Sequence, residues 1–448
     1  MFKKVGLWRG LTFTFSFLLG LSILTAQLAE SYRVQLDTVF QTQSYKIVTE
    51  ETDNEEDIWS YDSEWTSAKV AHDSLKDFSI REAEESMVLL KNNSNALPIS
   101  ATAKVTLLGV RSVAPVYGGA AGSISDKSTL NTIEECFAEK GFLLNPAMLN
   151  TYKEYRDTLT WGRGFGGGAP AFYSELDKYD SVPELSLSEL SAINANYQAN
   201  IAEYDDAAIV VVGRPAGEGK NGFRPGAAGL TSGSTVTGNV LALSDEEMEI
   251  INFAKNNFDK VIVLVNSAVQ MEIANIKADN EVDAIMWIGL PGSYGFYAVA
   301  DALSGKVNPS GHLGDIYAKN SALAPALMNH GNDTPWTNAA EIIAQGGANI
   351  NSYLIQAEGI YTGYRYYETR YADTVMTDKA DKAAKAKAAK AGTYSNADGT
   401  PATANGTWEY ANEVVYPFGY GDSYTTFSQT LNSVKVLGNK KTATVSVT

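Results

Sequence analysis

The chain has 448 residues, of which 44% are hydrophobic and 10% aromatic, a composition typical of a folded protein with two or three domains. Its 52 acidic residues outnumber the 35 basic ones and give a net charge of −17, which argues against a nucleic-acid partner because nucleic acids attract basic surfaces. The single cysteine, Cys136, excludes an intrachain disulfide, and the histidines His72, His312 and His330 lie too far apart for a metal-binding motif, so we expect no metal and no other cofactor.

The first thirty residues combine a positively charged start with an apolar run. Lys3, Lys4 and Arg9 precede Leu11–Leu28, an order typical of an export signal or a signal-anchor. The run is long for a signal peptide and no clean small-residue cleavage site follows it, which favours an uncleaved membrane anchor over residues 1–29. The rest of the chain is then expected on the extracellular side of the cell membrane, or secreted if the segment is cleaved.

The next part of the chain changes from a linker to helices and strands. Residues 30–76 are polar and acidic, as in a linker with short helical pieces. Apolar residues then recur at helical spacing and later form short buried runs separated by glycine-rich loops. The expected elements are a helix that begins near Lys76 and runs into VLLKNN, a strand at Lys104–Val110, a glycine-rich loop at Tyr117–Ser123, a helix at Thr129–Lys140 and an edge strand at Leu143–Leu144.

Residues 150–200 are less regular and are expected to form an insertion. Within them, Gly162, Gly164 and Gly167 satisfy the GxGxxG pattern of dinucleotide-binding proteins. No strand is expected before these glycines and Pro170 follows them, so the strand–turn–helix context of that pattern is missing. We therefore interpret the segment as a surface insertion.

A single glutamate follows the most apolar run of the chain. Ile209–Val212 is β-branched throughout and predicts a strand that is buried on both faces. The strand stops at Gly213 and is soon followed by Gly217-Glu218-Gly219. A carboxylate just past the carboxyl end of a buried strand lies where open α/β sheets bind their ligands. Spacing alone leaves a solvated loop glutamate as the alternative.

The remaining pattern alternates helices with buried strands. Ser244 starts a helix in which Glu247 completes a capping box. Strands are expected at Val261–Val265 and Ala284–Ile288, and a further helix at Ala298–Leu303. This order predicts an α/β fold, namely a three-layer α/β/α sandwich with a mainly parallel sheet.

The carboxyl-terminal part of the chain contains an insertion and a change of pattern. Residues 372–412 are expected to be the insertion, in which Lys379–Ala391 predicts a solvated helix. Beyond Thr425, apolar and polar residues alternate, which predicts the start of a fibronectin III-like β-sandwich at residues 428–448. The α/β sandwich itself is expected over residues 77–427.

Several segments follow one another in the order of a known family. They are SMVLLKN at Ser86–Asn92 with Leu97-Pro98, the glycine-rich loop at Tyr117–Ser123, DALSGKVNPSG at Asp301–Gly311, EGIYTGYRYY at Glu358–Tyr367 and YPFGYGDSYT at Tyr416–Thr425. Together they resemble the C-terminal α/β sandwich domain of glycoside hydrolase family 3, the β-glucosidase group. No single segment is decisive, but their shared order over about residues 78–427 makes a chance match implausible.

The resemblance implies a glycoside or oligosaccharide as substrate. In similar proteins a Gly-Glu-Gly loop carries the general acid/base of a retaining, two-carboxylate mechanism and reaches toward a sugar on a separate (β/α)8 barrel. Glu218 is then the catalytic residue, and Arg214 either orients its loop or binds substrate. The implied substrate-binding residues are Arg214, Gly217, Gly219, Tyr117, Gly118, Gly119 and Ser123.

The sequence departs from the family in ways that leave the sugar open. Gly311–Gly314 stands where the family has GRLP, Lys220 replaces a residue that is often acidic, and Asp422 replaces a leucine. The S-D-W-like motif of the family nucleophile and its K-H substrate pair are absent. A barrel of roughly 200 residues does not fit between the anchor and the sandwich. We therefore expect the barrel and the nucleophile downstream, after a fibronectin-like domain, as in permuted members of the family.

Two functions of different class follow from this reading. The first is an exported, membrane-anchored β-glucosidase-type enzyme, of which this chain alone is inactive. The alternative is a barrel-less module that binds carbohydrate or another protein. A homodimer is compatible with either function. An S-D-W-bearing barrel in the coding sequence beyond Thr448 would favour the enzyme, and a stop codon would favour the module.

Overall fold

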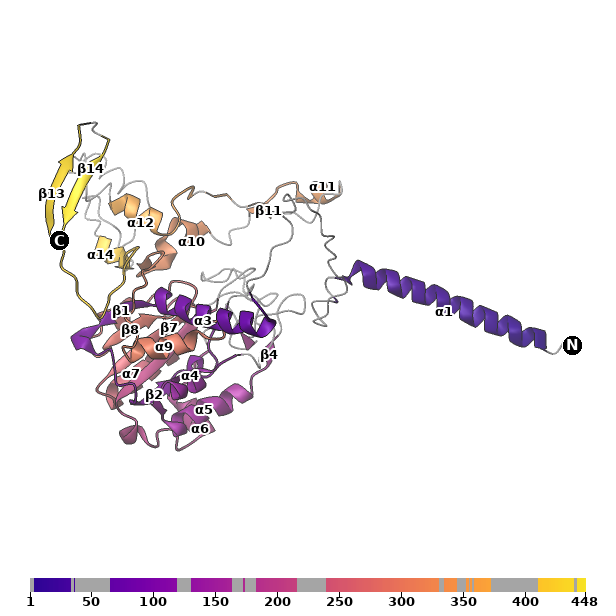
Figure 1. Ribbon diagram of the computed structural model, residues 1–448, viewed down its shortest axis with the longest axis horizontal. Helices are drawn as coiled ribbons and strands as arrows, with labels where there is room; N and C mark the ends of the chain where they lie inside the picture. The colour runs from indigo at the N-terminus through magenta and orange to yellow at the C-terminus, as the bar shows by residue number, and fades with distance from the viewer. Residues whose placement is uncertain are drawn as a thin grey trace.

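The computed structural model (Figure 1) describes most of the α/β region and the N-terminal helix. The described residues are 4–33, 36, 65–118, 130–162, 172–173, 183–215, 239–329, 334–344, 352–353, 355–356, 358–371, 410–438 and 441–448. The expected helix at Lys379–Ala391 lies outside these residues. Every statement below refers to the described part of the chain.

A six-stranded sheet forms the centre of the molecule, with the strand order β1-β8-β7-β6-β2-β3. The strand β1 runs antiparallel to β8, and all other neighbours are parallel. All eight residues of β6 and all seven of β7 are buried, as expected for strands covered on both faces. The bounds are β1 Val88–Asn92, β2 Lys104–Leu108, β3 Leu143–Leu144, β6 Ala207–Arg214, β7 Val261–Ser267 and β8 Ala284–Trp287.

Helices cover the sheet in two groups, which confirms the α/β prediction. In one group α9 contacts both α3 and α4, and in the other α6 contacts both α5 and α7. The chain moves from β2 to β3 in one direction along the sheet and from β3 to β6 in the other, so right-handed crossovers place α4 and α5–α7 on opposite faces. The helices are α3 Ala68–Ser86, α4 Ile133–Glu139, α5 Pro146–Asp157, α6 Leu187–Ile193, α7 Asp245–Asn257, α8 Ala274–Ala278 and α9 Gly295–Leu303.

Two expectations about local structure need correction. The helical pattern near Lys76 does not continue into VLLKNN, because α3 ends at Ser86 and the apolar run is β1. A run of four buried side chains is compatible with a strand that is covered on both faces as well as with a helix. The segment expected to be irregular also contains α6 and part of α5, whose N-caps Ser186 and Asn145 accept hydrogen bonds from helix N–H groups.

The first glycine of the GxGxxG segment, Gly162, lies in a short antiparallel pair of strands, whereas Gly164 and Gly167 lie outside the described residues. The strand β4, Trp161–Gly162, pairs antiparallel with β5, Phe172–Tyr173. A strand therefore does contain the first glycine, contrary to expectation, but its partner is antiparallel and close in sequence. This pairing differs from the parallel β-α-β unit of a dinucleotide site, so it agrees with the interpretation as an insertion.

A smaller layer lies beside the carboxyl-terminal half of the sheet. The strands β9, Tyr317–Ala318, and β12, Val414–Tyr416, form an antiparallel pair. Ile316, Ala318, Tyr367 and Val414 make a second hydrophobic cluster around this pair. Its other elements are η7 Ser321–Leu323, α10 Pro325–Asn329, α12 Tyr364–Tyr371 and α14 Tyr410–Glu413. Between α10 and α12 in the chain lie β10 Thr334–Pro335, α11 Ala339–Ala344 and β11 Ser352–Tyr353, of which β10 and β11 pair with each other.

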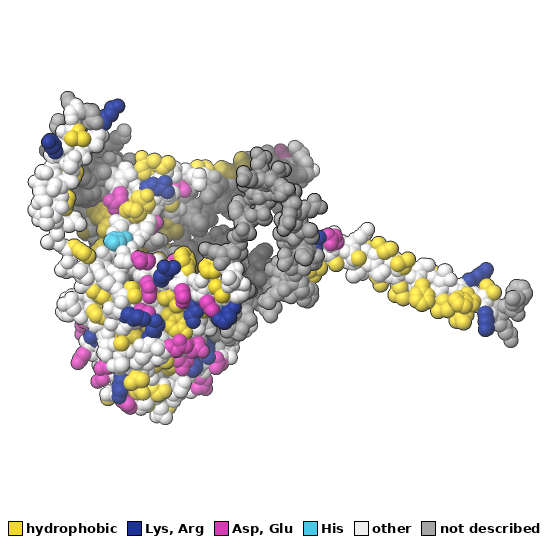
Figure 2. Space-filling view, viewed as in Figure 1, with side chains coloured by type: hydrophobic (Ala, Val, Ile, Leu, Met, Phe, Trp, Pro, Cys, Tyr) yellow, Lys and Arg dark blue, Asp and Glu magenta, His cyan; other side chains and the backbone are white. Residues whose placement is uncertain are grey.

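The two ends of the chain differ from this body. Helix α1, Val5–Ser31, has no buried residue and is long and apolar enough to span a membrane, a test that a signal sequence also passes. Figure 2 shows apolar side chains along it and basic ones near its N-terminal end. At the other end, β13, Leu431–Val436, and β14, Ala443–Val447, form an exposed two-stranded sheet. Two strands do not test the expected fibronectin III-like domain.

The lysine of the VLLKN segment stabilises a neighbouring helix. Lys91 is 8% exposed, and its Nζ donates to the carbonyls of Ile276, Lys277 and Asp279 at 3.3, 3.0 and 2.6 Å. These carbonyls belong to the end of α8, where helix hydrogen bonding leaves oxygens without a partner. Burial lowers the pKa of Lys91, although the carboxylates of Asp279 and Asp283 oppose this.

We expect Lys91→Met to lower the free energy of unfolding by about 1–3 kcal/mol, because it leaves these carbonyls without a donor in a partly buried position. Urea denaturation measures the change. Lys104→Met is the matched control, since the ammonium of Lys104 makes an exposed ion pair with Glu203 at 3.2 Å and lies over the Tyr204 ring, and it should cost less than about 1 kcal/mol. Equal losses in the two variants would contradict the capping role.

Candidate active site

The two loops singled out in the sequence leave adjacent strands. The loop that begins at Tyr117 follows β2, the loop that contains Glu218 follows β6, and β2 pairs with β6 in parallel from Val105 and Ala207 onward. After β2 the chain turns to one side of the sheet, and after β3 it crosses to the other. A parallel sheet opens a crevice at such a switch point, at the carboxyl ends of the strands. Both loops therefore leave the sheet at this switch point, where a crevice is expected.

Part of the expected site lies outside the described residues. This applies to Glu218 and its flanking glycines, Gly217 and Gly219, and also to Gly119 and Ser123. Their roles stay predictions. Tyr117, Gly118 and Arg214 are described.

Arg214 is the last residue of β6 and is 3% exposed. Its guanidinium forms a bidentate ion pair with Glu247, with Nη1–Oε1 and Nη2–Oε2 distances of 2.8 Å. The remaining N–H groups donate to the carbonyls of Gly213 at 2.9 Å, Val240 at 2.5 Å and Ala242 at 2.7 Å. Five donations satisfy all five guanidinium N–H groups.

This arrangement ties together the two ends of the Glu218 loop. Arg214 lies just before residues 216–238, and its acceptors Val240 and Ala242 lie just after them. A sugar hydroxyl would have to displace one of the five existing acceptors, so the geometry favours the orienting role of Arg214 over direct substrate binding. Glu247 is held in turn by its capping box, in which Oε2 accepts the N–H of Ser244 at 2.9 Å.

Asn266 holds the start of the other loop. It lies in β7 with no exposed surface, and its side chain forms two hydrogen bonds with Val116. Oδ1 accepts the Val116 N–H at 2.6 Å, and Nδ2 donates to the Val116 carbonyl at 2.9 Å and to the Gly289 carbonyl at 2.8 Å. Asn266 thereby fixes the direction in which the glycine-rich loop leaves the sheet.

Tyr117 itself is part of the core. It is 5% exposed, and its ring packs edge-on against Phe296 with a centroid distance of 5.8 Å. Its carbonyl accepts the N–H of Gly292 at 2.8 Å. A contact between this ring and a sugar would require the ring to leave the core. The position therefore favours backbone groups of the loop as the ones that face a ligand.

A half-buried carboxyl group, that of Glu184, lies near the carboxyl end of β2. Glu184 accepts the N–H of Val110, the residue after β2 and Gly109, at 2.9 Å through Oε2, and the N–H of Leu185 at 2.9 Å through Oε1. Burial raises the pKa of Glu184 to about 8, although these N–H groups and Arg111 act in the opposite direction. The nearby carboxylate of Glu247 also contributes to this raised pKa.

The raised pKa of Glu184 predicts a pH-dependent stability. The folded state keeps this carboxyl protonated up to about pH 8, whereas the unfolded chain releases the proton near its ordinary pKa. Stability is therefore highest below that ordinary pKa and falls as the pH rises toward about 8, by roughly 4–5 kcal/mol. Urea denaturation from pH 4.5 to 8.5 should show this slope, and it should be smaller in Glu184→Gln. An unchanged slope in the variant would contradict the assignment.

The family model for the glycosyl hydrolase family 3 C-terminal domain matches residues 87–424, about three quarters of the chain. The chain belongs to glycosyl hydrolase family 3. The resemblance of the motifs is thereby confirmed.

Relatives of this family 3 chain agree with the match. Beta-glucosidase A of Butyrivibrio fibrisolvens is 28% identical over 366 residues, which are 78% of this chain and 35% of the relative. A beta-glucosidase of Ruminococcus albus is 28% identical over 296 residues, 65% of this chain and 26% of the relative. The chain thus spans about a third or less of the length of these curated relatives.

Solved structures share the fold. A beta-glucosidase from Paenibacillus barengoltzii has a TM-score of 0.53 and 25% identity, and the match covers 81% of this chain and 31% of that one. Beta-glucosidase 3B from Thermotoga neapolitana, solved with alpha-D-glucose, has a TM-score of 0.52 and 24% identity, covering 84% and 41%.

The motif comparison did not identify three positioning side chains of the family 3 domain. Glu247 was expected only to cap α7, and Asn266 and Glu184 were not singled out. A charged residue directly after a fully apolar strand, as Arg214 is, indicates that a buried counter-charge exists. That signal does not identify which of the chain's many carboxylates is the buried counter-charge.

Proposed function

We propose that this chain supplies the acid/base loop of a β-glucosidase-type glycoside hydrolase. The crevice between β2 and β6 supports this proposal, because the Glu218 loop starts there and Arg214 ties its two ends together. Relatives named beta-glucosidase support the substrate class, an O-linked glycoside or oligosaccharide.

In the proposed mechanism Glu218 acts twice. Its carboxyl group first gives a proton to the glycosidic oxygen while a second carboxylate attacks the anomeric carbon and forms a covalent glycosyl-enzyme. The ionised Glu218 then takes a proton from water, whose oxygen attacks the anomeric carbon and releases the nucleophile. Retaining enzymes hold the two carboxyl groups about 5–5.5 Å apart. Enclosure between this domain and a barrel would raise the pKa of Glu218 by desolvation, as a proton donor requires.

We further propose that the second carboxylate comes from a (β/α)8 barrel outside these 448 residues. The chain contains no S-D-W-like motif. We expect the purified 448-residue chain to show no measurable turnover of 4-nitrophenyl β-glucoside, and the product of the complete gene to hydrolyse it. Strong turnover by the 448-residue chain would show that the nucleophile lies within it.

We also propose that α1 anchors the enzyme with its catalytic part on the outer side of the cell membrane. Lys3, Lys4 and Arg9 precede the apolar segment, which supports this orientation. In intact cells, external protease should then degrade the α/β domain while the membrane retains α1. Protection of the domain until the cells are lysed would contradict the orientation.

A further inference from the structure

The two-stranded sheet of β13 and β14 has one apolar face and one polar face. Side chains alternate along a strand, so residues that face each other across the pair share a side of the sheet. The apolar side is formed by three facing pairs, Leu431 with Val447, Val434 with Val445 and Val436 with Ala443, and we call these six residues the β13 face. The opposite side is formed by Ser433, Lys435, Thr444 and Ser446.

The β13 face is open to solvent. Its five larger side chains are between 53 and 62% exposed, and Figure 1 shows the two strands in yellow at one edge of the molecule. Contiguous apolar surface of this kind marks an interaction site in folded proteins. A two-stranded sheet is also only marginally stable until its apolar face is covered. The face therefore requires a partner surface.

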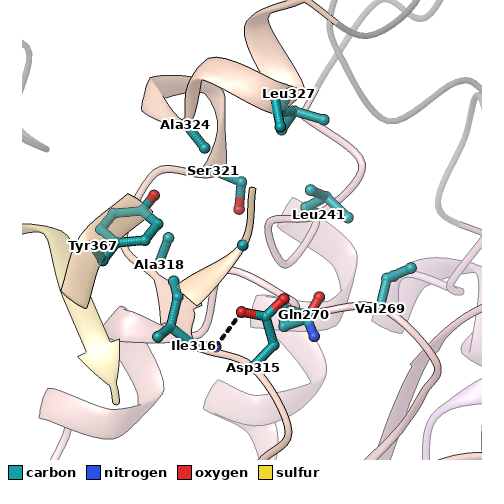
Figure 3. Close-up of a pocket in the computed structure, with 12 residues that line it drawn as sticks. Leu241, Val269, Gln270, Asp315, Ile316, Ala318, Ser321, Ala324, Leu327 and Tyr367 are labelled. Atoms are coloured by element: carbon teal, nitrogen blue, oxygen red, sulfur yellow. Dashed lines mark hydrogen bonds between the residues drawn. The ribbon is translucent and has the colours of Figure 1, made fainter. Parts of the chain in front are cut away.

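The other short sheet of this region shows how such residues become buried. In β9 and β12, the side chains of Ile316, Ala318 and Val414 are 5, 4 and 6% exposed. They pack with Tyr367 of α12 in one hydrophobic cluster, and Figure 3 shows Ile316, Ala318 and Tyr367 side by side. Neither hydrophobic cluster among the described residues contains a residue of β13 or β14.

A second copy of the β13 face matches it in chemistry. The face carries no charged or hydrogen-bonding side chain, so two such faces meet without burying an unpaired polar group. Lys435 lies on the opposite side of the sheet and keeps its contact with water. Two stacked sheets interdigitate their side chains about 10 Å apart, and a two-fold axis lets both copies use the same surface.

The area of the β13 face limits the strength of such a contact. Five side chains that are about half exposed offer roughly 500 Å² on each copy, so stacking removes roughly 1,000 Å² from water, near the lower limit for a specific interface. The net charge of −17 on each copy opposes association. We therefore expect a reversible dimer with a dissociation constant on the order of 10 μM, which falls as added salt screens the repulsion.

We propose that two copies of this chain associate through the β13 face, with the β13–β14 sheet of one copy stacked on that of the other. The pairing is independent of the proposed function, because no residue expected to hold substrate belongs to the β13 face. It assigns a surface to the homodimer with which the sequence is compatible.

Cysteine cross-linking tests the location of the interface. The single native thiol, Cys136, has no exposed surface, so an introduced cysteine reacts without background. With a short bis-maleimide, Val434→Cys should give a covalent dimer, and Ser433→Cys, on the polar side, should give at least tenfold less. Both variants carry the same α1, so clustering through that apolar helix contributes equally to each. Equal yields would overturn the proposal.

Analytical ultracentrifugation in one detergent tests the contribution of the face. Val434→Thr/Val445→Thr keeps the shape and strand preference of both side chains but adds hydroxyl groups, so it should raise the dissociation constant at least tenfold. Ser433→Thr/Ser446→Thr, on the polar side, should change it less than about threefold. An unchanged constant in the first variant, or a wild-type chain that stays monomeric at about 100 μM, would overturn the proposal.

Thiol accessibility separates a second copy from other covers of the face. If a second copy covers it, a bulky maleimide should label Val434→Cys in dilute protein and label it more slowly as the protein concentration rises. Slow labelling of Val434→Cys in a monomer at every concentration would assign the cover to another part of the same polypeptide. That result would overturn the proposal as well.

Discussion

Replacement of Arg214 by methionine is expected to lower the free energy of unfolding by about 3–5 kcal/mol, one of the two largest effects that the structure predicts. The side chains of Arg214 and Glu247 are each 4% exposed, and they form a bidentate pair. Without the guanidinium, the Glu247 carboxylate keeps its burial but loses its counter-charge. The carbonyls of Val240 and Ala242 also lose their donor.

A matched control separates the buried pair from the chemistry of the substitution. Arg156→Met makes the same change at an ion pair whose acid, Asp157, is 68% exposed. We expect a loss below about 1 kcal/mol there. Arg214→Met/Glu247→Met should recover part of the loss, because no buried charge is then left unpaired. Urea denaturation that gives similar losses for Arg214→Met and Arg156→Met would contradict the assigned role.

The strands that organise the crevice could be predicted from the sequence. Continuous β-branched or apolar runs mark β6, β7 and β8, because strands of a parallel sheet are buried on both faces. The start of α7 could also be predicted, since Ser244 and Glu247 lie in a capping box that the structure contains.

The strand β1 and helices α5 and α6 were harder to predict for different reasons. The apolar run of β1 has no alternation, so its register with β8 and its antiparallel direction depend on a partner almost 200 residues away in sequence. Helix α5 has a clear start at Asn145-Pro146. The irregular sequence that follows, rich in glycine and aromatic residues, obscures the helical spacing of its apolar residues.

The positioning contacts of the site could not be predicted from the sequence. Arg214 and Glu247 are 33 positions apart, and Val116 and Asn266 are 150 apart. Periodicity reports which face of an element is buried, not which two polar groups meet in the interior.

The second large effect is expected for Glu218→Gln and concerns the rate of glycoside hydrolysis. In the proposed glycosidase, general acid catalysis by Glu218 should contribute about 10²–10⁴-fold to departure of a poor leaving group. Glutamine keeps the size of the side chain but has no proton to give. A strongly activated leaving group departs without protonation, so its kcat/KM should fall less than about tenfold.

A second observation should accompany this change. The same variant lacks the base that activates water in the deglycosylation step, so a glycosyl-enzyme should accumulate with an activated substrate. Azide needs no base to attack, so added azide should restore turnover and yield a β-glycosyl azide. Glu184→Gln is a suitable comparison. The Glu184 side chain contacts Val110, just after β2, and is not expected to transfer a proton to substrate.

The most direct test of the acid/base assignment is therefore the ratio of kcat/KM for 2,4-dinitrophenyl β-glucoside to that for an alkyl β-glucoside, measured in the wild-type glycosidase and in Glu218→Gln. The account predicts that the substitution raises this ratio by about 10²-fold or more. Equal loss of kcat/KM on both substrates, or no loss on either, would contradict the assignment of Glu218 as the proton donor.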